Sequence, residues 1–318
     1  MTKEAVYAAL AERDGYLSGS VLARTLGVSR NSIFKAVEQL RREGVPIEAA
    51  PNRGYRLLPE AALRAQSISA RLETAQLGRN LEVAALLSST NDVAKQRAAD
   101  GAPHGTVIVA DHQSAGRGRR GRCFFSPPGC GVYMSVILRD GLSAEKVGLL
   151  TSAAAVAVAE AIESFVPAAV QIKWVNDLLI DGKKICGILT EGSLYAENGE
   201  YEYAVLGIGI NVGTVDFPPE LETVATSIQA ATGTAVDRAA LIAAILGQLE
   251  RTLATMEDGA FLAESRRRSA VLGKTVTVLQ GNDRYPARAV EIDSQGRLVV
   301  ETDAGRRTVL SGEVSLRL

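Results

Sequence analysis

The sequence contains few of the residues on which metal and nucleophile chemistry usually depends. Its three cysteines, Cys123, Cys130 and Cys186, match neither a zinc motif nor a disulfide framework. Its two histidines, His104 and His112, leave little scope for a histidine zinc site or a Ser-His-Asp triad. These absences disfavour zinc enzymes and serine hydrolases, and the cysteine usage suggests a reducing compartment such as the cytoplasm.

Long apolar segments and excess charge are also missing. The N-terminus lacks the apolar run of a signal peptide. The longest apolar stretch, residues 147–162, is alanine-rich and is interrupted by Gly148 and Glu160, which is typical of a buried helix. The formal net charge is −1, so any basic function must be local. With 318 residues and 47% hydrophobic content, we expect an ordinary globular chain of two or three domains without membrane attachment.

The most informative feature that is present is the segment Gly116–Arg122. Its seven positions hold four arginines and three glycines, between the strand-like segments 106–109 and 132–138. Glycine permits close approach to a ligand, and arginine donates forked hydrogen bonds to phosphate or carboxylate oxygens. We interpret the segment as an ordered anion-binding loop. A merely solvated basic loop and contact with nucleic acid are the alternatives.

Two other patterns match this segment less well. Gly116, Gly118 and Gly121 have the spacing of a dinucleotide-binding fingerprint, but that motif must open a helix. Pro127 and Pro128 follow shortly afterwards and prevent one. An RGG-type RNA tail would be disordered and low in complexity, whereas strand-like segments enclose this one.

Residues 1–57 have the pattern of a winged helix-turn-helix. Apolar residues recur at helical spacing over residues 3–11. Ser20 is expected to cap a second helix, and Ser29 to cap a third helix after a glycine turn. Residues 47–58 are expected to form a hairpin, which would be the wing.

The second and third helices of this unit are expected to be amphipathic. Their inner faces would contain Val21, Leu22, Leu26, Ile33, Val37 and Leu40. A polar face near the start of the third helix is what a protein needs to contact the DNA major groove. The predicted DNA-binding residues are Ser29, Arg30, Asn31, Lys35 and, at the hairpin tip, Arg53. The alternative is a solvated helical cap, since residues 1–60 hold nine basic and seven acidic side chains.

The region after this unit alternates between strand-like and helical segments, which predicts an α/β fold. A long helix is expected over residues 143–165, with further helices over roughly 221–230 and 236–256. The strand-like segment 205–212 contains two glycines, which suggests that something flat lies against its backbone.

Two polar corners occur in the same region. Residues 88–92 end an apolar strand and begin a helix, so their small polar side chains hold a ligand or only cap the helix. Residues 171–191 predict an antiparallel meander whose corner carries Asn176 and Asp177. Such side chains bind a divalent cation together with a phosphate, or only make a turn. The residues alone leave both choices open.

The C-terminal segment, residues 271–318, changes character. Short strand-like segments recur at regular spacing, with turns at 294–296 and 303–305. A small β-barrel is expected. The predicted domains are therefore residues 1–62, 63–270 and 271–318.

Five motifs resemble those of biotin protein ligases in order and spacing. They are Ser89-Thr90-Asn91, Gln113 with the loop Gly116–Arg122, Lys173-Trp174-x-Asn176-Asp177, Lys184-x-x-Gly187-Ile188-Leu189-x-Glu191, and Gly207-x-Gly209-x-Asn211. With the N-terminal and C-terminal units, the resemblance covers nearly the whole chain. The sequence is similar in particular to the ligases that also repress the biotin operon. Cys123-Phe124 stands where the family often has a basic residue and tryptophan, and Val175 where it usually has proline.

The resemblance implies a fold and a reaction. The fold would be α/β (α+β): a winged helix-turn-helix, a class II synthetase-like catalytic domain with a mixed sheet, and an SH3-like barrel. The carboxylate of biotin would attack the α-phosphate of ATP, with Mg²⁺, to give biotinoyl-5′-AMP. A lysine of the biotin carboxyl carrier protein would then displace AMP. Operator DNA of biotin genes and a ligand-linked homodimer are also implied, with biotinoyl-5′-AMP as corepressor.

The resemblance also implies roles for matching positions. Lys184, Arg117, Arg119 and Asp177 would be catalytic, and Asp177 would also bind the metal ion. The residues implied to bind biotin and ATP are Ser89, Thr90, Asn91, Gln113, Arg117, Gly118, Arg119, Arg122, Phe124, Lys173, Asn176, Lys184, Gly187, Gly207, Gly209 and Asn211. The stacking of adenine would fall to Phe124. A lipoate or octanoate ligase, and a regulator that senses biotin without transferring it, are the alternatives.

Overall fold

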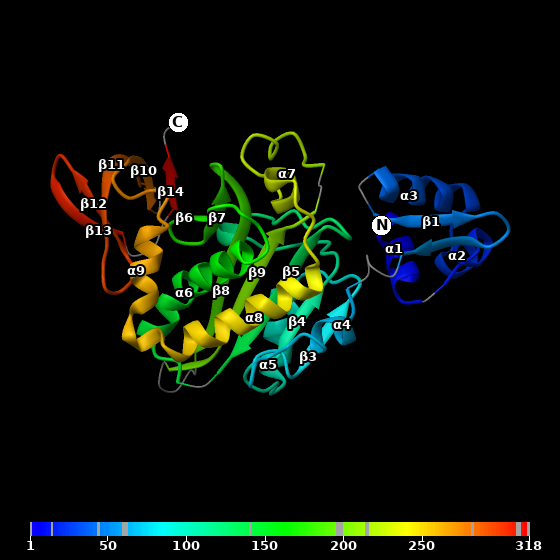
Figure 1. The fold of residues 1–318 in the computed structure, drawn as a ribbon, viewed down its shortest axis with the longest axis horizontal. Coiled ribbons are helices and arrows are strands. Elements are labelled where there is room, and N and C mark those ends of the chain that lie inside the picture. Colours follow the sequence, from blue (N-terminus) through cyan, green and yellow to red (C-terminus); the bar gives the residue numbers. More distant parts are fainter. Residues whose placement is uncertain are drawn as a thin grey trace.

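The chain forms three units that follow one another along its longest axis (Figure 1). The computed structural model describes residues 2–13, 15–42, 45–58, 63–139, 141–194, 200–213, 216–280, 283–309 and 313–316. The first predicted domain junction, residues 59–62, lies outside these ranges. The domain limits themselves stay a prediction.

The N-terminal unit is a helix-turn-helix with a hairpin wing. Helices α1 (Thr2–Ala11), α2 (Gly19–Leu26) and α3 (Arg30–Arg42) precede strands β1 (Ile47–Ala50) and β2 (Gly54–Leu57), which pair antiparallel. The apolar faces of these elements form a hydrophobic cluster of their own. Ser29 caps α3 as predicted, because its hydroxyl accepts a hydrogen bond from the Ser32 amide at 3.1 Å.

Two local predictions for α2 are wrong. The helix is capped by Ser18, whose hydroxyl accepts a hydrogen bond from the Val21 amide at 3.2 Å, and Ser20 lies within the helix. Val21 is 44% exposed, whereas Leu22 is 1% exposed. Ser18 and Ser20 are both residue types that cap helices. The helix that starts after Ser18 also places Leu22 in the core.

In the described part of the chain, the central unit contains a seven-stranded mixed sheet in the order β3-β4-β5-β9-β8-β7-β6. The strands are β3 (Leu81–Ala84), β4 (Val107–Ala110), β5 (Gly131–Leu138), β6 (Gln171–Lys173), β7 (Asp177–Ile180), β8 (Lys183–Leu194) and β9 (Tyr201–Asn211). Strands β3 and β4 are parallel, and the other neighbours are antiparallel. The predicted meander is confirmed as β6, β7 and β8.

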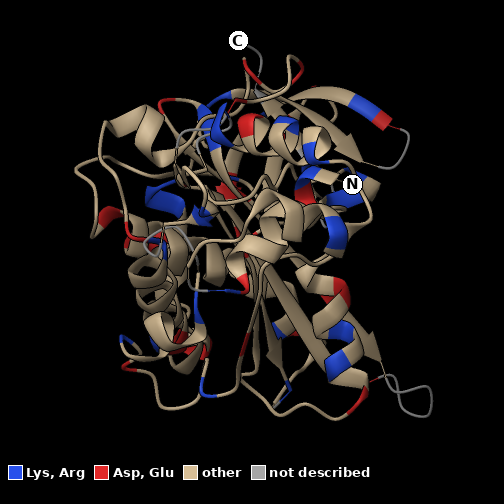
Figure 2. Cartoon of the chain, turned by 90° about the vertical axis from the view of Figure 1, so that its right-hand side faces the viewer, with Lys and Arg blue, Asp and Glu red and all other residues tan. Residues whose placement is uncertain are grey.

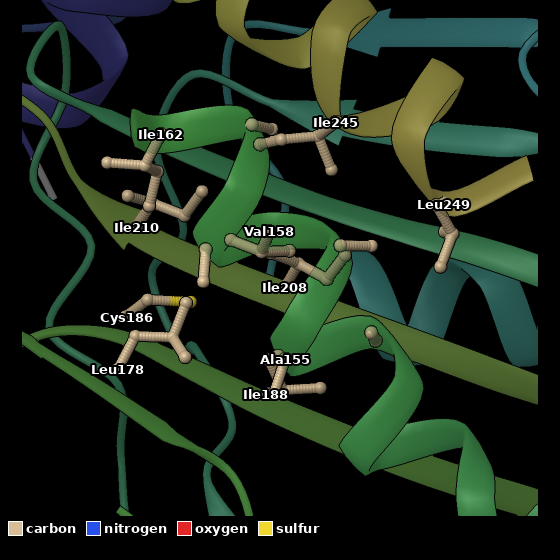
Figure 3. Packing of buried hydrophobic residues seen from close by; sticks show 14 of the residues in the cluster. Ala155, Val158, Ile162, Leu178, Cys186, Ile188, Ile208, Ile210, Ile245 and Leu249 are labelled. Atoms are coloured by element: carbon tan, nitrogen blue, oxygen red, sulfur yellow. The ribbon is translucent and has the colours of Figure 1, made fainter. Parts of the chain in front are cut away.

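Helices cover both faces of this sheet. The predicted long helix is α6 (Ala144–Glu163), which packs with α8 (Arg238–Ala254) on one face, while α5 (Thr90–Ala99) covers the other. Figure 3 shows Val158 of α6 packed beside Ile208 of β9. The run of small buried alanines in α6 lets the helix approach the sheet closely. None of the described helices combines the length and apolarity needed to cross a membrane.

The helix predicted over residues 221–230 is wrong for most of its length. Only the short α7 (Ile228–Thr232) forms there, capped by Ser227. The preceding backbone is held in another way, because the Lys184 amide donates to the Val224 carbonyl and the Thr226 amide donates to the Lys184 carbonyl. This pairing to β8 replaces a helical turn. The short helices α4 (Ala65–Ser69) and α9 (Ala260–Arg267) were not predicted.

The C-terminal unit is an antiparallel sheet in the order β13-β12-β11-β10-β14. Its strands are β10 (Thr275–Gln280), β11 (Asp283–Ile292), β12 (Leu298–Thr302), β13 (Gly305–Val309) and β14 (Glu313–Leu316). Its hydrophobic cluster includes Trp174 from the central unit, whose indole N–H donates to the Gly296 carbonyl at 2.9 Å. The sheet therefore lies against the corner that carries Asn176 and Asp177.

A buried polar cluster joins the N-terminal unit to the centre. Tyr7 of α1 donates a hydrogen bond to Asp111, which follows β4, and Arg238 at the start of α8 pairs with the same carboxylate. Tyr7, Asp111 and Arg238 are 0%, 2% and 9% exposed. Burial, together with the Asp111 carboxylate, raises the pKa of Tyr7 well above its ordinary value, so the hydroxyl remains a donor. These contacts therefore attach α1 of the N-terminal unit to the central unit.

Candidate functional site

A pocket opens where the start of α5, the arginine-rich loop and strands β8 and β9 meet. Its lining residues are Ser89, Thr90, Asn91, Gln113, Arg117, Gly118, Arg119, Phe124, Asn176, Lys184, Gly187, Ile188, Leu189, Gly207, Ile208 and Gly209. Most of the predicted ligand-binding residues are therefore brought together, although they come from segments far apart in the sequence. Their individual roles stay predictions.

One end of the pocket is a buried network of neutral polar groups. Gln113 Oε1 accepts hydrogen bonds from the Thr90 amide at 2.8 Å and from the Thr90 hydroxyl at 3.1 Å. Gln113 Nε2 donates to Ser126 Oγ at 2.9 Å. Ser89 stands at the N-cap of α5 but makes no capping bond with its side chain. The capping interpretation of this corner is therefore wrong for Ser89, whose hydroxyl instead lines the pocket.

Asn91 completes this network and explains one of the glycines in β9. Ser135 donates to Asn91 Oδ1 at 2.6 Å, and Asn91 Nδ2 donates to Glu191 at 2.8 Å. A Cβ at Gly207 would lie 2.0 Å from Asn91 Oδ1. The strand needs glycine here because the Asn91 amide occupies the space of a side chain.

The segment Gly116–Arg122 is an ordered loop, as predicted. The Gly118 amide donates to the Arg122 carbonyl at 2.7 Å, and the Phe124 amide donates to the Gly116 carbonyl at 2.8 Å. A Cβ at Gly116 would lie 2.5 Å from the Phe124 carbonyl oxygen, so this glycine allows the loop to close on itself. Backbone hydrogen bonds thus hold the arginines in a short hairpin instead of a flexible tail.

Arg117 belongs to a network of ion pairs at the pocket rim. Its guanidinium lies 2.6 Å from Asp92 and 3.2 Å from Glu191, and Lys95 Nζ lies 3.1 Å from each of these carboxylates. Partial burial opposes ionisation of Asp92, but hydrogen bonds from Lys95 and Arg117 outweigh it and lower the pKa of the carboxyl. The hydrogen bond to Asp92 also raises the pKa of Arg117. Asp92 and Arg117 therefore stay charged at neutral pH.

The other cations of the pocket face the strand corner. Arg119 Nη1 donates to Asn176 Oδ1 at 3.1 Å, and Lys184 Nζ lies 2.6 Å from Asp177 Oδ1. The Asn176 amide donates to the same Asp177 oxygen at 3.1 Å. Two cations from different segments therefore point at one amide–carboxylate corner, next to the neutral polar network.

Phe124 is the flat group that lies against the glycines of the sheet. Gly187 of β8 and Gly209 of β9 are directly paired, and a Cβ at Gly209 would lie 2.8 Å from the Phe124 ring. The ring also makes an edge contact with Tyr133, at 6.3 Å between centroids. The flat group predicted to lie against the glycine-containing strand is thus a side chain of the protein itself. The stacking of Phe124 on adenine stays a prediction.

Some predicted residues lie outside the pocket lining. Asn211 ends β9 and donates to the Thr226 carbonyl at 3.0 Å, and Lys173 pairs with Asp177 in the sheet. Arg122 does not line the pocket. In contrast, Ile188, Leu189 and Ile208 line it although they were not predicted. The alternation of β8 and β9 does not reveal them, because they contribute apolar surface beside the paired glycines.

The described residues contain no group of three or more His, Cys, Asp or Glu side chains placed to hold a metal ion. The predicted metal ligand Asp177 offers one carboxylate, which Lys184 already contacts. Mg²⁺ commonly binds through one or two carboxylates and takes its other ligands from water and substrate phosphates. The donor set therefore fits a cation that arrives with a nucleotide.

The predicted DNA-binding residues lie on α3 and the wing. Ser29, Arg30, Asn31 and Lys35 are exposed. Arg53 lies at the hairpin tip, with its guanidinium carbon 4.1 Å from the centroid of the Tyr16 ring. Figure 2, which faces this unit, shows basic positions along the backbone with acidic positions among them, and the formal net charge of the chain is −1. Any DNA contact must therefore depend on these local residues.

Comparisons with known proteins give matches in three parts of the chain. An HTH domain matches residues 2–56, the Biotin/lipoate A/B protein ligase family matches residues 83–211, and the Biotin protein ligase C terminal domain matches residues 271–317. The Bifunctional ligase/repressor BirA of Bacillus subtilis is 38% identical over 309 residues, which is 95% of this chain and 94% of that protein. BirA of Escherichia coli is 30% identical over 314 residues, covering 97% and 95%.

A solved structure is similar over three quarters of the chain. The biotin protein ligase from Aquifex aeolicus in complex with biotin and ATP has a TM-score of 0.64 and 28% identity. The match covers 75% of this chain and 99% of that one.

Proposed function

The chain belongs to the family of biotin protein ligases that carry an N-terminal helix-turn-helix domain, and we propose that it attaches biotin to a carrier protein with ATP. The observation that carries this proposal is the meeting of Arg117, Arg119 and Lys184 beside the polar network around Asn91. Such a pocket can hold a neutral polar group at one end and anionic groups at the other. Biotin has a ureido ring and a carboxylate, and ATP supplies the phosphates.

The first step joins two anions. An oxygen of the biotin carboxylate attacks the α-phosphate of ATP, the bond to the β-phosphate oxygen breaks, and biotinoyl-5′-AMP and pyrophosphate result. Ser89, Asn91 and Gln113 would bind the ureido group. Arg119 and Lys184 would hold the carboxylate against the α-phosphate and stabilise the charge that develops on its oxygens. The reaction needs no enzyme nucleophile, only positioned donors and cations.

The cations of the pocket are already paired inside the protein. Lys184 lies against Asp177, and Arg117 against Asp92 and Glu191. These pairs fix the side chains before the substrates arrive, so little rearrangement is needed when an anion takes over part of the interaction. Pairing also lowers the mutual repulsion of the cations while no substrate is present.

The second step forms the amide. The amine of a carrier lysine attacks the acyl carbon of the adenylate, the bond to phosphate breaks, and AMP leaves. The amine must lose a proton, which the Asp177 carboxylate would accept. Mg²⁺ bound to ATP would neutralise phosphate charge, with Asp177 and Asn176 as its protein ligands.

The ligase proposal is tested with the purified full chain, biotin, ATP, Mg²⁺ and a biotin carboxyl carrier domain. We expect biotin on one carrier lysine, detected by mass spectrometry, and no product when EDTA removes the Mg²⁺. Absence of transfer at saturating substrates would overturn the proposal. Competition between biotin and lipoate in an adenylation assay separates this activity from that of a lipoate ligase.

The N-terminal unit supports a second function, repression at the operator DNA of biotin genes. Its support is the helix-turn-helix with exposed Arg30, Asn31 and Lys35, together with the relatives named as repressors. A ligand-linked homodimer and a place in the cytoplasm, where ATP, carrier and DNA occur together, belong to the same proposal. Gel shift and sedimentation of the full chain, with and without biotin and ATP, test it. Failure to bind the operator in either state would remove this part.

A further inference from the structure

Helix α3 carries an aromatic side chain that the fold does not bury. Phe34 is 52% exposed, whereas its neighbours Ile33 and Val37 are fully buried. The hydrophobic cluster of the N-terminal unit does not contain Phe34. Large aromatic side chains usually contribute most of their surface to a core or an interface. Since the core of this unit does not use Phe34, an interface is the remaining use of the ring.

Phe34 lies among the predicted DNA-binding residues. It follows Arg30 by four positions and Asn31 by three, which places the three side chains next to one another on the helix surface. Lys35 is the next exposed residue along the helix. Within the described part of the chain, the side chains of Arg30 and Lys35 make no hydrogen bond or ion pair. The ring is thus next to cationic groups that no described residue neutralises.

Charge decides what covers this face. An apolar partner protein would have to bury Arg30 and Lys35 or pair them, whereas DNA supplies phosphates on both sides of the major groove. The major groove also presents one apolar group on its base edges, the C5-methyl of thymine. The first turns of α3 offer cations, an amide and an aromatic ring, which match phosphates, a base edge and a methyl group.

We propose that Phe34 packs against a thymine C5-methyl in the major groove and thereby selects a T·A pair at one position of each half-site. The inference rests on the proposed DNA binding and adds the residue and the base that set specificity there. The polar residues on either side place the helix, and the aromatic ring discriminates thymine from cytosine or from a base without the methyl group.

The test removes the methyl group from the DNA and the ring from the protein. Duplexes that bind the full-length chain are selected from a random pool, and each thymine is then replaced in turn by deoxyuridine, which lacks only the methyl. At one position per half-site the unchanged protein should lose about fourfold in affinity, the factor expected for one buried methyl group. Phe34→Ala should bind the thymine and deoxyuridine duplexes equally.

Matched variants separate the outcomes. Val21→Ala removes another exposed apolar side chain from the same unit and should keep the thymine preference. Adenylate formation by Phe34→Ala should equal that of the unchanged protein, which shows that the variant is folded. If Phe34→Ala keeps the preference, or changes self-association instead of DNA affinity, this inference is wrong while DNA binding stands. If no duplex is enriched by the unchanged protein, the proposed DNA binding fails as well.

Discussion

The pocket and the outer face of α3 use positive charge in opposite ways. In the pocket, Lys184 and Arg117 each lie within 3.2 Å of a carboxylate from another segment. On α3, Arg30 and Lys35 extend into solvent without a partner among the described residues. Both regions are candidates for binding phosphate, but only one of them holds its cations in place before the ligand arrives.

The difference follows from what each region has to do. An adenylation site must place a carboxylate against a phosphorus atom within a fraction of an ångström, so its cations need fixed positions. A DNA-binding helix must release counterions and slide between sites, and mobile solvated cations serve that purpose. If this contrast is correct, substitutions in the pocket should change rates, whereas those on α3 should change the salt dependence of binding.

The largest expected effect is on Lys184. Lys184→Ala removes a cation held beside the proposed reaction centre, and adenylate formation should fall by about 10²-fold or more. Pyrophosphate release in the presence of biotin and ATP measures this rate. The matched control is Lys183→Ala, because that lysine is exposed and, among the described residues, its side chain donates only to the Glu222 carbonyl, at 3.2 Å.

Lys183 and Lys184 are neighbours in β8, and each substitution removes one positive charge. A difference between the two variants therefore reports on the position of the cation and not on the loss of charge. Equal losses in both would mean that net charge near the pocket matters and fixed pairing does not. The contrast between the two regions would then lose its basis.

The next effect concerns the neutral end of the pocket. Gly207→Ala would force the Asn91 amide to move, since the new Cβ would lie 2.0 Å from its oxygen. Loss of one or two hydrogen bonds to the ureido group should raise the KM for biotin about tenfold, with less change in kcat. Gly247→Ala in α8 is the control, because its Cβ would meet only Arg251, at 3.6 Å. An unchanged KM would mean that Asn91 does not contact biotin.

The glycines show how far the sequence could be interpreted. The arginine-rich loop, the wing and the meander were predictable because local spacing and turn residues determine them. Two contacts were not predictable, those of Asn91 with Gly207 and of Phe124 with Gly209, because they join segments far apart in the chain. That these residues form one pocket was predicted only from the resemblance to a family. Local patterns indicated its parts separately.

The wrongly predicted helix and one missed contact have a similar origin. Residues 221–227 contain apolar residues at helical spacing, but their backbone pairs with Lys184 in β8. The Tyr7–Asp111 contact spans 104 positions and has no signal in either segment. Tertiary hydrogen bonds decided both cases, and a single sequence does not display them.

A smaller effect is expected on α3. Arg30→Ala should weaken binding to operator DNA several-fold and reduce the slope of log affinity against log salt by about 1, as expected for one lost phosphate contact. Arg97→Ala serves as the control, because that arginine lies on α5 and is already paired with Glu82 at 2.9 Å. Fluorescence anisotropy over a range of salt concentrations measures the slope. An unchanged slope would indicate that Arg30 does not face phosphate.

The smallest expected effect lies at the contact between α1 of the N-terminal unit and the central unit. Tyr7→Phe removes the hydroxyl that donates to Asp111, but Arg238 and the Gly129 amide still bond this carboxylate. Tyr7 bonds Oδ2 of Asp111, whereas Arg238 and the Gly129 amide bond Oδ1. Because the buried charge stays paired through Oδ1, the free energy of unfolding should fall by about 1 kcal/mol, at the low end of the cost of a lost partner. Denaturant unfolding of the full chain measures it. Tyr55→Phe, which removes a hydroxyl without a hydrogen bond among the described residues, should leave stability unchanged.

This substitution also tests whether the two regions act separately. If the cluster only holds α1 in place, Tyr7→Phe should leave adenylate formation and the salt slope of DNA binding unchanged. Asp111 lies two positions before Gln113, however, and Gln113 bonds Thr90 at the neutral end of the pocket. A rise in the KM for biotin without a change in kcat would mean that the docking of α1 reaches the pocket through Gln113. The fixed geometry of the pocket would then depend on the DNA-binding unit as well as on its own ion pairs.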